Sequence, residues 1–117
     1  MYEIEFYDTE SGKCPAEEFL DSLESKIKAK TLRNIDLLET NGTILREPYS
    51  CSMGGGLFEL RTKLGSNITR IFYFFDGKKI ILTNGFVKKT QKTPKNVLEL
   101  ARKYMSDHLR RCKDEQL

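Results

Sequence analysis

The sequence predicts an α+β fold, in which a helical hairpin and a C-terminal helix pack on a small, mostly antiparallel sheet. Residues 2–7 alternate between apolar and acidic side chains, which is typical of a half-buried strand. Two stretches with helical periodicity follow over residues 15–41. Residues 57–87 are rich in β-branched and aromatic residues. The 117 residues suit one hydrophobic core, so we expect a single domain over residues 1–117.

The N-terminal third is expected to contain one strand and the helical hairpin. In the strand YEIEFY, the two glutamates point away from the aromatic and aliphatic side chains. Pro15 can occupy the first turn of a helix, because the missing N–H is not needed there. The helical periodicity continues to Asn41-Gly42, a typical helix end. A joint near Glu24–Ser25 divides this region into two antiparallel helices.

The second half is expected to form three consecutive strands and a final helix. Residues 48–56 precede them, and their Gly54-Gly55-Gly56 run predicts a flexible loop. The strands are expected at Leu57–Lys63, Ile68–Phe75 and Lys79–Val87. Asp76-Gly77 predicts a hairpin turn, and the last helix is expected from about Pro94 to Cys112. The predicted order is therefore strand, helix, helix, strand, strand, strand, helix.

Composition narrows the class of protein. No apolar run approaches the roughly 20 residues that span a bilayer, and the start MYEIEFYDTE has neither a basic head nor an apolar core. We therefore expect a cytoplasmic protein without a membrane contact. Cys14, Cys51 and Cys112 are odd in number, far apart and without C-x-x-C spacing. This pattern favours reduced thiols over a disulfide framework or a zinc site.

Positive charge is concentrated in the last third of the chain. Residues 1–77 carry 9 Lys and Arg against 13 Asp and Glu, whereas residues 78–117 carry 11 against 4. Six lysines and no acid lie between Lys78 and Lys95. Such a segment is typical of a surface that faces a polyanion or an acidic partner. On charge alone, a merely solvated face explains the pattern equally well.

The residue types exclude several catalytic mechanisms. The chain has one histidine, His108, so a two-histidine ribonuclease mechanism is impossible. The predicted strands offer only Glu59 and Asp76 as carboxylates, too few for a metal-dependent nuclease, and Asp76 belongs to a turn. No serine or cysteine has a visible base partner. We therefore expect neither a metal nor another cofactor, and the remaining chemistry belongs to Arg, Lys and Tyr.

Two arginines on adjacent strands are the strongest site candidates. Arg61 and Arg70 lie on strands joined by a short turn, and an arginine pair recognises phosphate bidentately. If Ile71 and Tyr73 face the helices, alternation places Arg70 on the open side of the sheet. Further cations follow the third strand and can converge on the same rim: Lys88, Lys89 and Lys92. Exposed charges that keep strand edges unpaired are an equally weighted alternative.

If this cluster cleaves a nucleic acid, its chemistry indicates RNA. Without a metal or a protein nucleophile, the attacking group is the 2′-hydroxyl, which DNA lacks. Arg61 and Arg70 could hold the phosphate, and a desolvated Lys88 or Lys89 could have a lowered pKa and remove the hydroxyl proton. Further candidates for RNA contact are Lys78, Lys79, Lys92, Tyr73 and Phe86. For the two aromatic residues, core packing is the favoured alternative.

Several of these residues lie in motifs that resemble a known family. The stretch LFELRTKLGSNITRIFYFF, then IILTNGFVKKTQKTP and a closing amphipathic helix, resemble the phage-derived HigB-like branch of the RelE/ParE toxin superfamily. The resemblance implies the compact RelE-like fold and a toxin that cleaves mRNA in the ribosomal A site through the 2′-hydroxyl, without metal. It implies site positions at or near Arg61, Arg70, Lys88 and Lys89, with Lys92 as a weaker candidate.

The resemblance also implies partners. These are mRNA on the ribosome and a HigA-like helix-turn-helix antitoxin, with operator DNA bound only through the antitoxin. Many nucleases of the superfamily carry an additional catalytic Tyr or His near the C-terminus, and neither Tyr104 nor His108 matches such a position. The same fold also hosts gyrase inhibitors, and a non-catalytic adaptor that binds RNA or protein is a further alternative. The basic motif after the last strand favours RNA.

Overall fold

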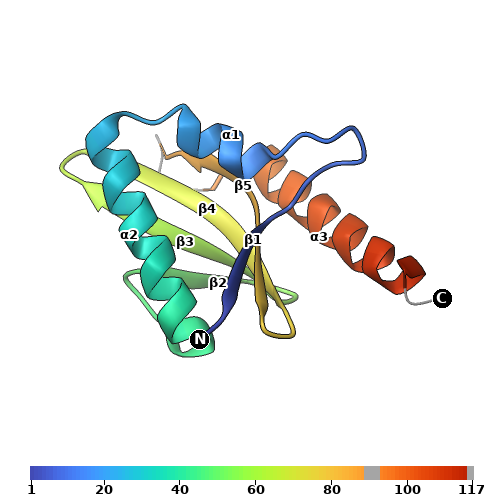
Figure 1. Ribbon diagram of the computed structural model, residues 1–117. Helices are drawn as coiled ribbons and strands as arrows, with labels where there is room; N and C mark the ends of the chain where they lie inside the picture. Colours follow the sequence, from blue (N-terminus) through green and yellow to red (C-terminus); the bar gives the residue numbers. More distant parts are fainter. Residues whose placement is uncertain (89–92, 116–117) are drawn as a thin grey trace.

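A five-stranded sheet with three α-helices forms the structure, a computed structural model that describes residues 1–88 and 93–115 (Figure 1). The strands are β1 (Glu3–Phe6), β2 (Ser50–Gly54), β3 (Leu57–Leu64), β4 (Asn67–Asp76) and β5 (Lys79–Val87). The helices are α1 (Pro15–Asp21), α2 (Ser25–Asn41), the 3-10 turn η1 (Gly42–Ile44) and α3 (Lys95–Glu115). Within these ranges, no helix combines the length and apolarity needed to cross a membrane.

The predicted α+β class is confirmed, two helices are present over the region expected to form a helical hairpin, and the predicted element order is wrong by one strand. Residues 50–54, expected to lie in a loop, form β2 and pair with β3. The sequence SCSMG gives little strand signal, because it contains no β-branched or aromatic residue. Gly54, Gly55 and Gly56 all have positive φ and form the turn between the two strands. The triglycine run therefore closes a hairpin.

The strand order β1-β5-β4-β3-β2 combines local and non-local pairing. β1 pairs with β5 in parallel, with Glu3 opposite Lys79, whereas the other neighbouring strands are antiparallel. Parallel pairing requires a crossover connection, and the chain from α1 through β4 supplies it. In the β3–β4 hairpin, Arg61 lies directly opposite Arg70. The sheet is thus mostly antiparallel, as predicted.

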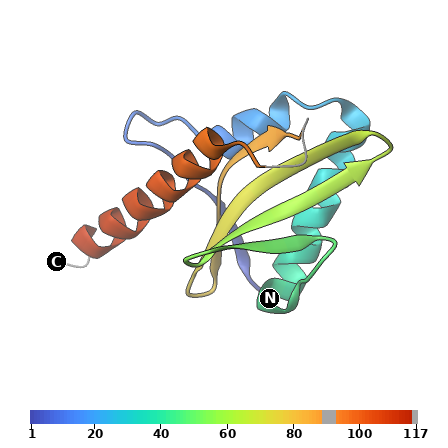
Figure 2. The ribbon, with the colours of Figure 1, turned by 180° about the vertical axis from the view of Figure 1, so that it is seen from behind.

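Helices cover both faces of the sheet, as Figures 1 and 2 show from opposite sides. The α1 and α2 helices bury Leu20 and Leu38 against Ile71 and Tyr73, so the predicted facing of β4 is confirmed. The opposite face was expected to be open, but α3 crosses part of it. An apolar stripe on α3 supplies this cover, and its members are Val97, Leu98, Ala101, Tyr104 and Met105. Arg70 therefore lies on a partly covered face.

Side chains of α2 complete the edge of β3 that β2 leaves unpaired. The pairing with β2 ends at Leu60. Beyond it, the Asn34 amide donates to the Arg61 carbonyl oxygen at 3.1 Å, and the Lys30 amine donates to the Lys63 carbonyl oxygen at 2.5 Å. Buried backbone acceptors need such partners, and an exposed edge invites intermolecular pairing. These contacts hold the N-terminal half of α2 beside the two-arginine segment of the sheet.

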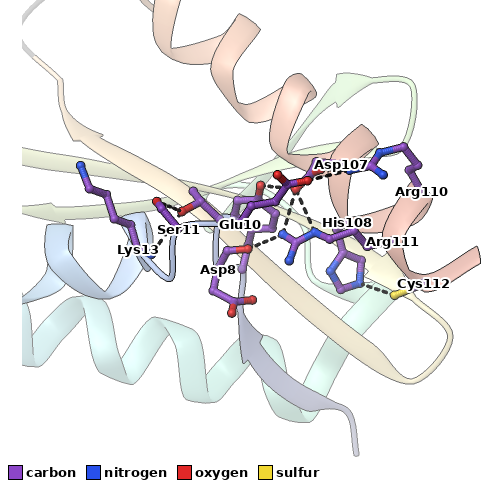
Figure 3. A network of polar contacts seen from close by, with 11 residues as sticks. Asp8, Glu10, Ser11, Lys13, Asp107, His108, Arg110, Arg111 and Cys112 are labelled. Atoms are coloured by element: carbon purple, nitrogen blue, oxygen red, sulfur yellow. Dashed lines mark hydrogen bonds and ion pairs between the residues drawn. The ribbon is translucent and has the colours of Figure 1, made fainter. Parts of the chain in front are cut away.

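A polar network attaches the C-terminal half of α3 to the chain that follows β1 (Figure 3). The buried Tyr7 hydroxyl donates to Asp107 Oδ2 at 2.6 Å, and Arg111 Nη2 lies 2.8 Å from the same oxygen. The Arg111 guanidinium also lies over the Tyr7 ring, 5.3 Å from its centroid. Hydrogen bonds from Tyr7, Arg110 and Arg111 lower the pKa of Asp107 to about 2.

Removing the Tyr7 hydroxyl tests this attachment. We expect Tyr7→Phe to lower the free energy of unfolding by about 1.5–3 kcal/mol, because a hydrogen bond to a charged group is lost while the ring stays packed. Tyr104→Phe is the matched control, because burial and the charge of Glu18, rather than a hydrogen bond, raise the pKa of the Tyr104 hydroxyl. Urea denaturation of the three proteins measures the difference. Equal losses in both variants would contradict the assignment.

The lowered pKa of Asp107 predicts an acid-dependent contribution to stability. An unfolded aspartate takes up its proton near pH 3.8, whereas the folded group holds its charge down to about pH 2. The stabilisation is therefore fully present above the pKa of the unfolded aspartate, and it is lost as the pH falls through the pKa of Asp107 in the folded protein. We expect the difference in free energy of unfolding between the wild type and Asp107→Asn to narrow as the pH falls from about 5 to about 2. Urea denaturation at each pH measures this difference. A gap independent of pH would contradict this prediction.

Candidate functional site

A buried carboxylate, Glu59, organises the two candidate arginines. Its side chain is 0% exposed, and its Oε1 pairs with Arg70 Nη1 and lies 3.4 Å from Arg61 Nε. Its Oε2 accepts a hydrogen bond from the Thr93 hydroxyl at 3.0 Å. Glu59 comes from β3, Arg70 from β4 and Thr93 from the segment before α3. A buried charge needs such partners, so Glu59 fixes the positions of both arginines.

The two arginines differ in what they can reach. The Arg70 side chain is 7% exposed and is held by Glu59, and its buried Nε has no hydrogen-bond partner among the described residues. The Arg61 side chain is 32% exposed and lies next to solvent, with a weak contact of 3.7 Å to the exposed Glu47. Arg61 is therefore free to contact a bound anion, whereas Arg70 acts mainly through its charge.

A pocket of about 350 Å³ lies beside the unpaired segment of β3. Its volume falls in the range of small-ligand sites. The lining residues are Lys30, Asn34, Pro48, Tyr49, Arg61, Thr62, Lys63, Ile68 and Arg70. Four of these nine residues are cations and none is an acid. The pocket therefore favours an anionic ligand.

Lys88 lies next to the two arginines at the end of β5. Burial and the charges of Arg70 and Arg61 lower the pKa of its ammonium group, and Glu59 partly opposes this effect. The Lys88 backbone N–H donates to the Ile68 carbonyl oxygen at 2.8 Å, which holds the residue beside β4. A larger fraction of neutral amine follows from the lowered pKa, and this is the form that accepts a proton.

The remaining basic candidates do not all lie at this site. Lys89 and Lys92 fall outside the described residues. Lys78 and Lys79 lie at the β4–β5 turn, at the opposite end of β4 from Arg70. Lys79 forms an ion pair of 3.4 Å with Glu5, which raises its pKa. Lys78 and Lys79 therefore belong to a different surface from Lys88, which lies beside the two arginines.

Neither aromatic candidate presents a free ring for stacking. Tyr73 is 1% exposed, lies in the core between the sheet and the α1–α2 layer, and exchanges a hydrogen bond with the Ser50 hydroxyl. Phe86 is 9% exposed and packs against Phe72, with the ring centroids 5.8 Å apart. Both rings serve the core, the alternative that the sequence favoured.

Two residues at the site were not assigned a role from the sequence. Glu59 is the anchor of the arginines, and its signal was present, because alternation places it on the same face as Arg61. Tyr49 lines the cationic pocket and is 40% exposed. An exposed aromatic ring beside cations can stack on a nucleobase. Tyr49 lies just before β2, the strand that the sequence did not predict, so no sequence pattern indicated that Tyr49 lies near Arg61.

The geometry supports binding of a phosphate-containing ligand. The three cations Arg61, Arg70 and Lys88 outnumber the two carboxylates beside them, Glu59 and Glu47, so the site carries surplus positive charge. His108 lies elsewhere, near Asp76 at the far end of β4. Acid–base chemistry at this site therefore falls to lysine and tyrosine side chains, of which Lys88 has the lowered pKa.

Comparison with known protein families identifies a match over most of the chain. The model of the family described as phage derived protein Gp49-like (DUF891) matches residues 18–106 of the 117. A search of curated proteins found no match. The matched region contains β2 to β5 and most of α3, and therefore the whole arginine site. The chain belongs to the Gp49-like family of phage-derived proteins, a toxin-like family within the broader RelE group.

Proposed function

We propose that this protein is the toxin of a type II toxin–antitoxin system and cleaves mRNA on translating ribosomes. The observation that carries the proposal is the position of Arg61 directly opposite Arg70 at a cationic pocket, beside Lys88. The toxin-like family supports the biological class. The cytoplasm, where ribosomes translate, is then the site of action, and one RelE-like domain over residues 1–117 carries it.

The proposed reaction uses the 2′-hydroxyl of RNA as the attacking group. Arg61 contacts the phosphate and stabilises the charge that develops on its oxygens, and Arg70 adds a fixed positive charge from behind. Lys88, with its lowered pKa, takes the proton of the hydroxyl. Tyr49 stacks on a neighbouring base in the pocket. In this proposal Lys89 and Lys92 add positive charge after β5.

The ribosome and an antitoxin are the proposed partners. The described site offers lysine and tyrosine side chains but no histidine to protonate the leaving 5′-oxygen, so in this proposal translating ribosomes orient the RNA and complete the acid–base chemistry. A HigA-like helix-turn-helix antitoxin neutralises the toxin and binds operator DNA. Its acidic or backbone acceptor groups would contact the pocket cations, of which Arg61 and Arg70 already share the carboxylate of Glu59.

The sharpest test of the proposed reaction is Arg61→Ala. We expect this variant to reduce mRNA cleavage in a translating extract about 10²-fold or more, because one stabilising donor at a developing oxyanion is worth that much. Primer extension on the extracted mRNA maps and quantifies the cuts. Lys103→Ala on α3 is the matched control, because it removes one exposed cation outside the pocket.

Three results would contradict or redirect the proposal. Undiminished cleavage by a folded Arg61→Ala protein removes the role assigned to Arg61. A wild-type protein that binds RNA but leaves mRNA intact on translating ribosomes is a non-catalytic adaptor. Inhibition of DNA supercoiling in place of translation identifies a gyrase inhibitor.

The Glu59–Arg70 pair predicts a separate effect on stability. We expect Arg70→Ala to lower the free energy of unfolding by about 3–5 kcal/mol, because it leaves a buried carboxylate without its main partner. The double variant Glu59→Leu/Arg70→Met should recover most of this loss, because it removes both charges at similar volume. Urea denaturation of the single and double variants completes the cycle. An Arg70→Ala protein as stable as the wild type would contradict the pairing.

A further inference from the structure

A second cluster of functional side chains lies at the far end of β4, away from the arginine site. Asp76 ends β4, and His108 and Cys112 lie one turn apart on α3. Their ligand atoms all lie within 4.8 Å of one another. Figure 3 shows the His108 ring and the Cys112 sulfur turned toward each other. The three residues come from two elements that are remote in the sequence.

The arrangement of donors is not that of a proton relay. In a Cys-His-Asp triad, the thiol and the carboxylate contact different nitrogens of the imidazole ring. Here Asp76 Oδ2 lies 3.1 Å from His108 Nε2, and Cys112 Sγ lies 3.4 Å from the same nitrogen. Sγ and Oδ2 are 3.9 Å apart. The three atoms therefore converge on one point.

These separations match a tetrahedral zinc ion. Zinc binds imidazole nitrogen and carboxylate oxygen at about 2.0–2.2 Å and thiolate sulfur at about 2.3 Å. Tetrahedral angles then place the ligand atoms roughly 3.4 to 3.6 Å apart. The three measured separations, 3.1, 3.4 and 3.9 Å, bracket this range. A small adjustment of the Asp76 carboxylate brings them into it.

The donor types select the metal. One thiolate, one imidazole and one carboxylate are the ligands that zinc prefers, whereas magnesium and calcium prefer oxygen alone. The His108 side chain is 14% exposed and its ring packs edge-on against Phe74, which fixes its orientation. The Asp76 side chain is 36% exposed, so a fourth ligand from solvent can complete the tetrahedron.

We propose that Asp76, His108 and Cys112 form a zinc site that fastens the C-terminal half of α3 to the β4–β5 hairpin. Zinc adds three directional bonds between two elements that already meet here through the Asp76–His108 hydrogen bond, sulfur contacts and the packing of His108 against Phe74. Because the metal binds the folded arrangement, it stabilises the docked helix. The site is independent of the arginine pocket and of the function proposed for it.

Zinc titration of the full-length, chelator-stripped protein tests the proposal. We expect one equivalent to bind by calorimetry and to raise the thermal midpoint by about 5 °C or more at saturation. Cobalt in place of zinc should give the absorption band of a thiolate-bound ion. His108→Ala and Cys112→Ser should each weaken binding at least tenfold, whereas Cys51→Ser on β2, the matched control, should bind as the wild type does.

One measurement needs no variant. His108 is the chain's single histidine, so its ring resonances are unambiguous by NMR and should shift on addition of one equivalent of zinc. The proposal is overturned by unshifted His108 resonances, by a cobalt complex without the thiolate band, or by binding that survives both ligand variants. Loss of binding in Cys51→Ser would overturn it equally, because that thiol lies outside the cluster.

Discussion

The buried carboxylate of Glu59 is the interaction on which the functional face of the sheet depends. It is fully enclosed, and it draws Arg70, Arg61 and Thr93 from three segments of the chain. Taking one carboxylate out of water costs several kcal/mol, and that cost is offset only while the cations stay in place. The β3–β4 register and the start of α3 are therefore tied to one group. A change at Glu59 would disturb all three together.

The contacts with Glu59 give the two arginines different roles. Arg70 is turned inward to balance the carboxylate, and its remaining donors have little access to solvent. Arg61, directly across the strand pair, shares the same carboxylate through Nε but keeps its outer donors near the pocket. Arg70 is thus a rigid cation behind Arg61, which a ligand can reach. This arrangement keeps the two guanidinium groups from rotating when an anion binds. Preorganisation of this kind costs no reordering at the moment of reaction.

Strand alternation predicted the orientation of the site but not its surroundings. Residues Ile71 and Tyr73 face α1 and α2, so the placement of Arg70 on the other face follows from local periodicity alone. The same period puts Glu59 beside Arg61, yet burial of that carboxylate depends on α3 and Thr93, which are remote in sequence. The sequence did not predict β2, because its five residues include no typical strand-forming side chain. Backbone pairing with β3 and the glycine turn hold this strand in place. Tyr49 was missed for the same reason.

The long final helix connects the two ends of β4. At its N-terminal end, Thr93 reaches the buried carboxylate, and near its C-terminal end His108 contacts Asp76. Between them, Ala101 and Met105 pack on the sheet, so the helix is held at both ends and along its apolar stripe. Packing alone would let such a helix slide by small amounts, because apolar contacts have no direction. Directional contacts at both ends fix its register, and they thereby fix Thr93 against Glu59 and both arginines at the pocket.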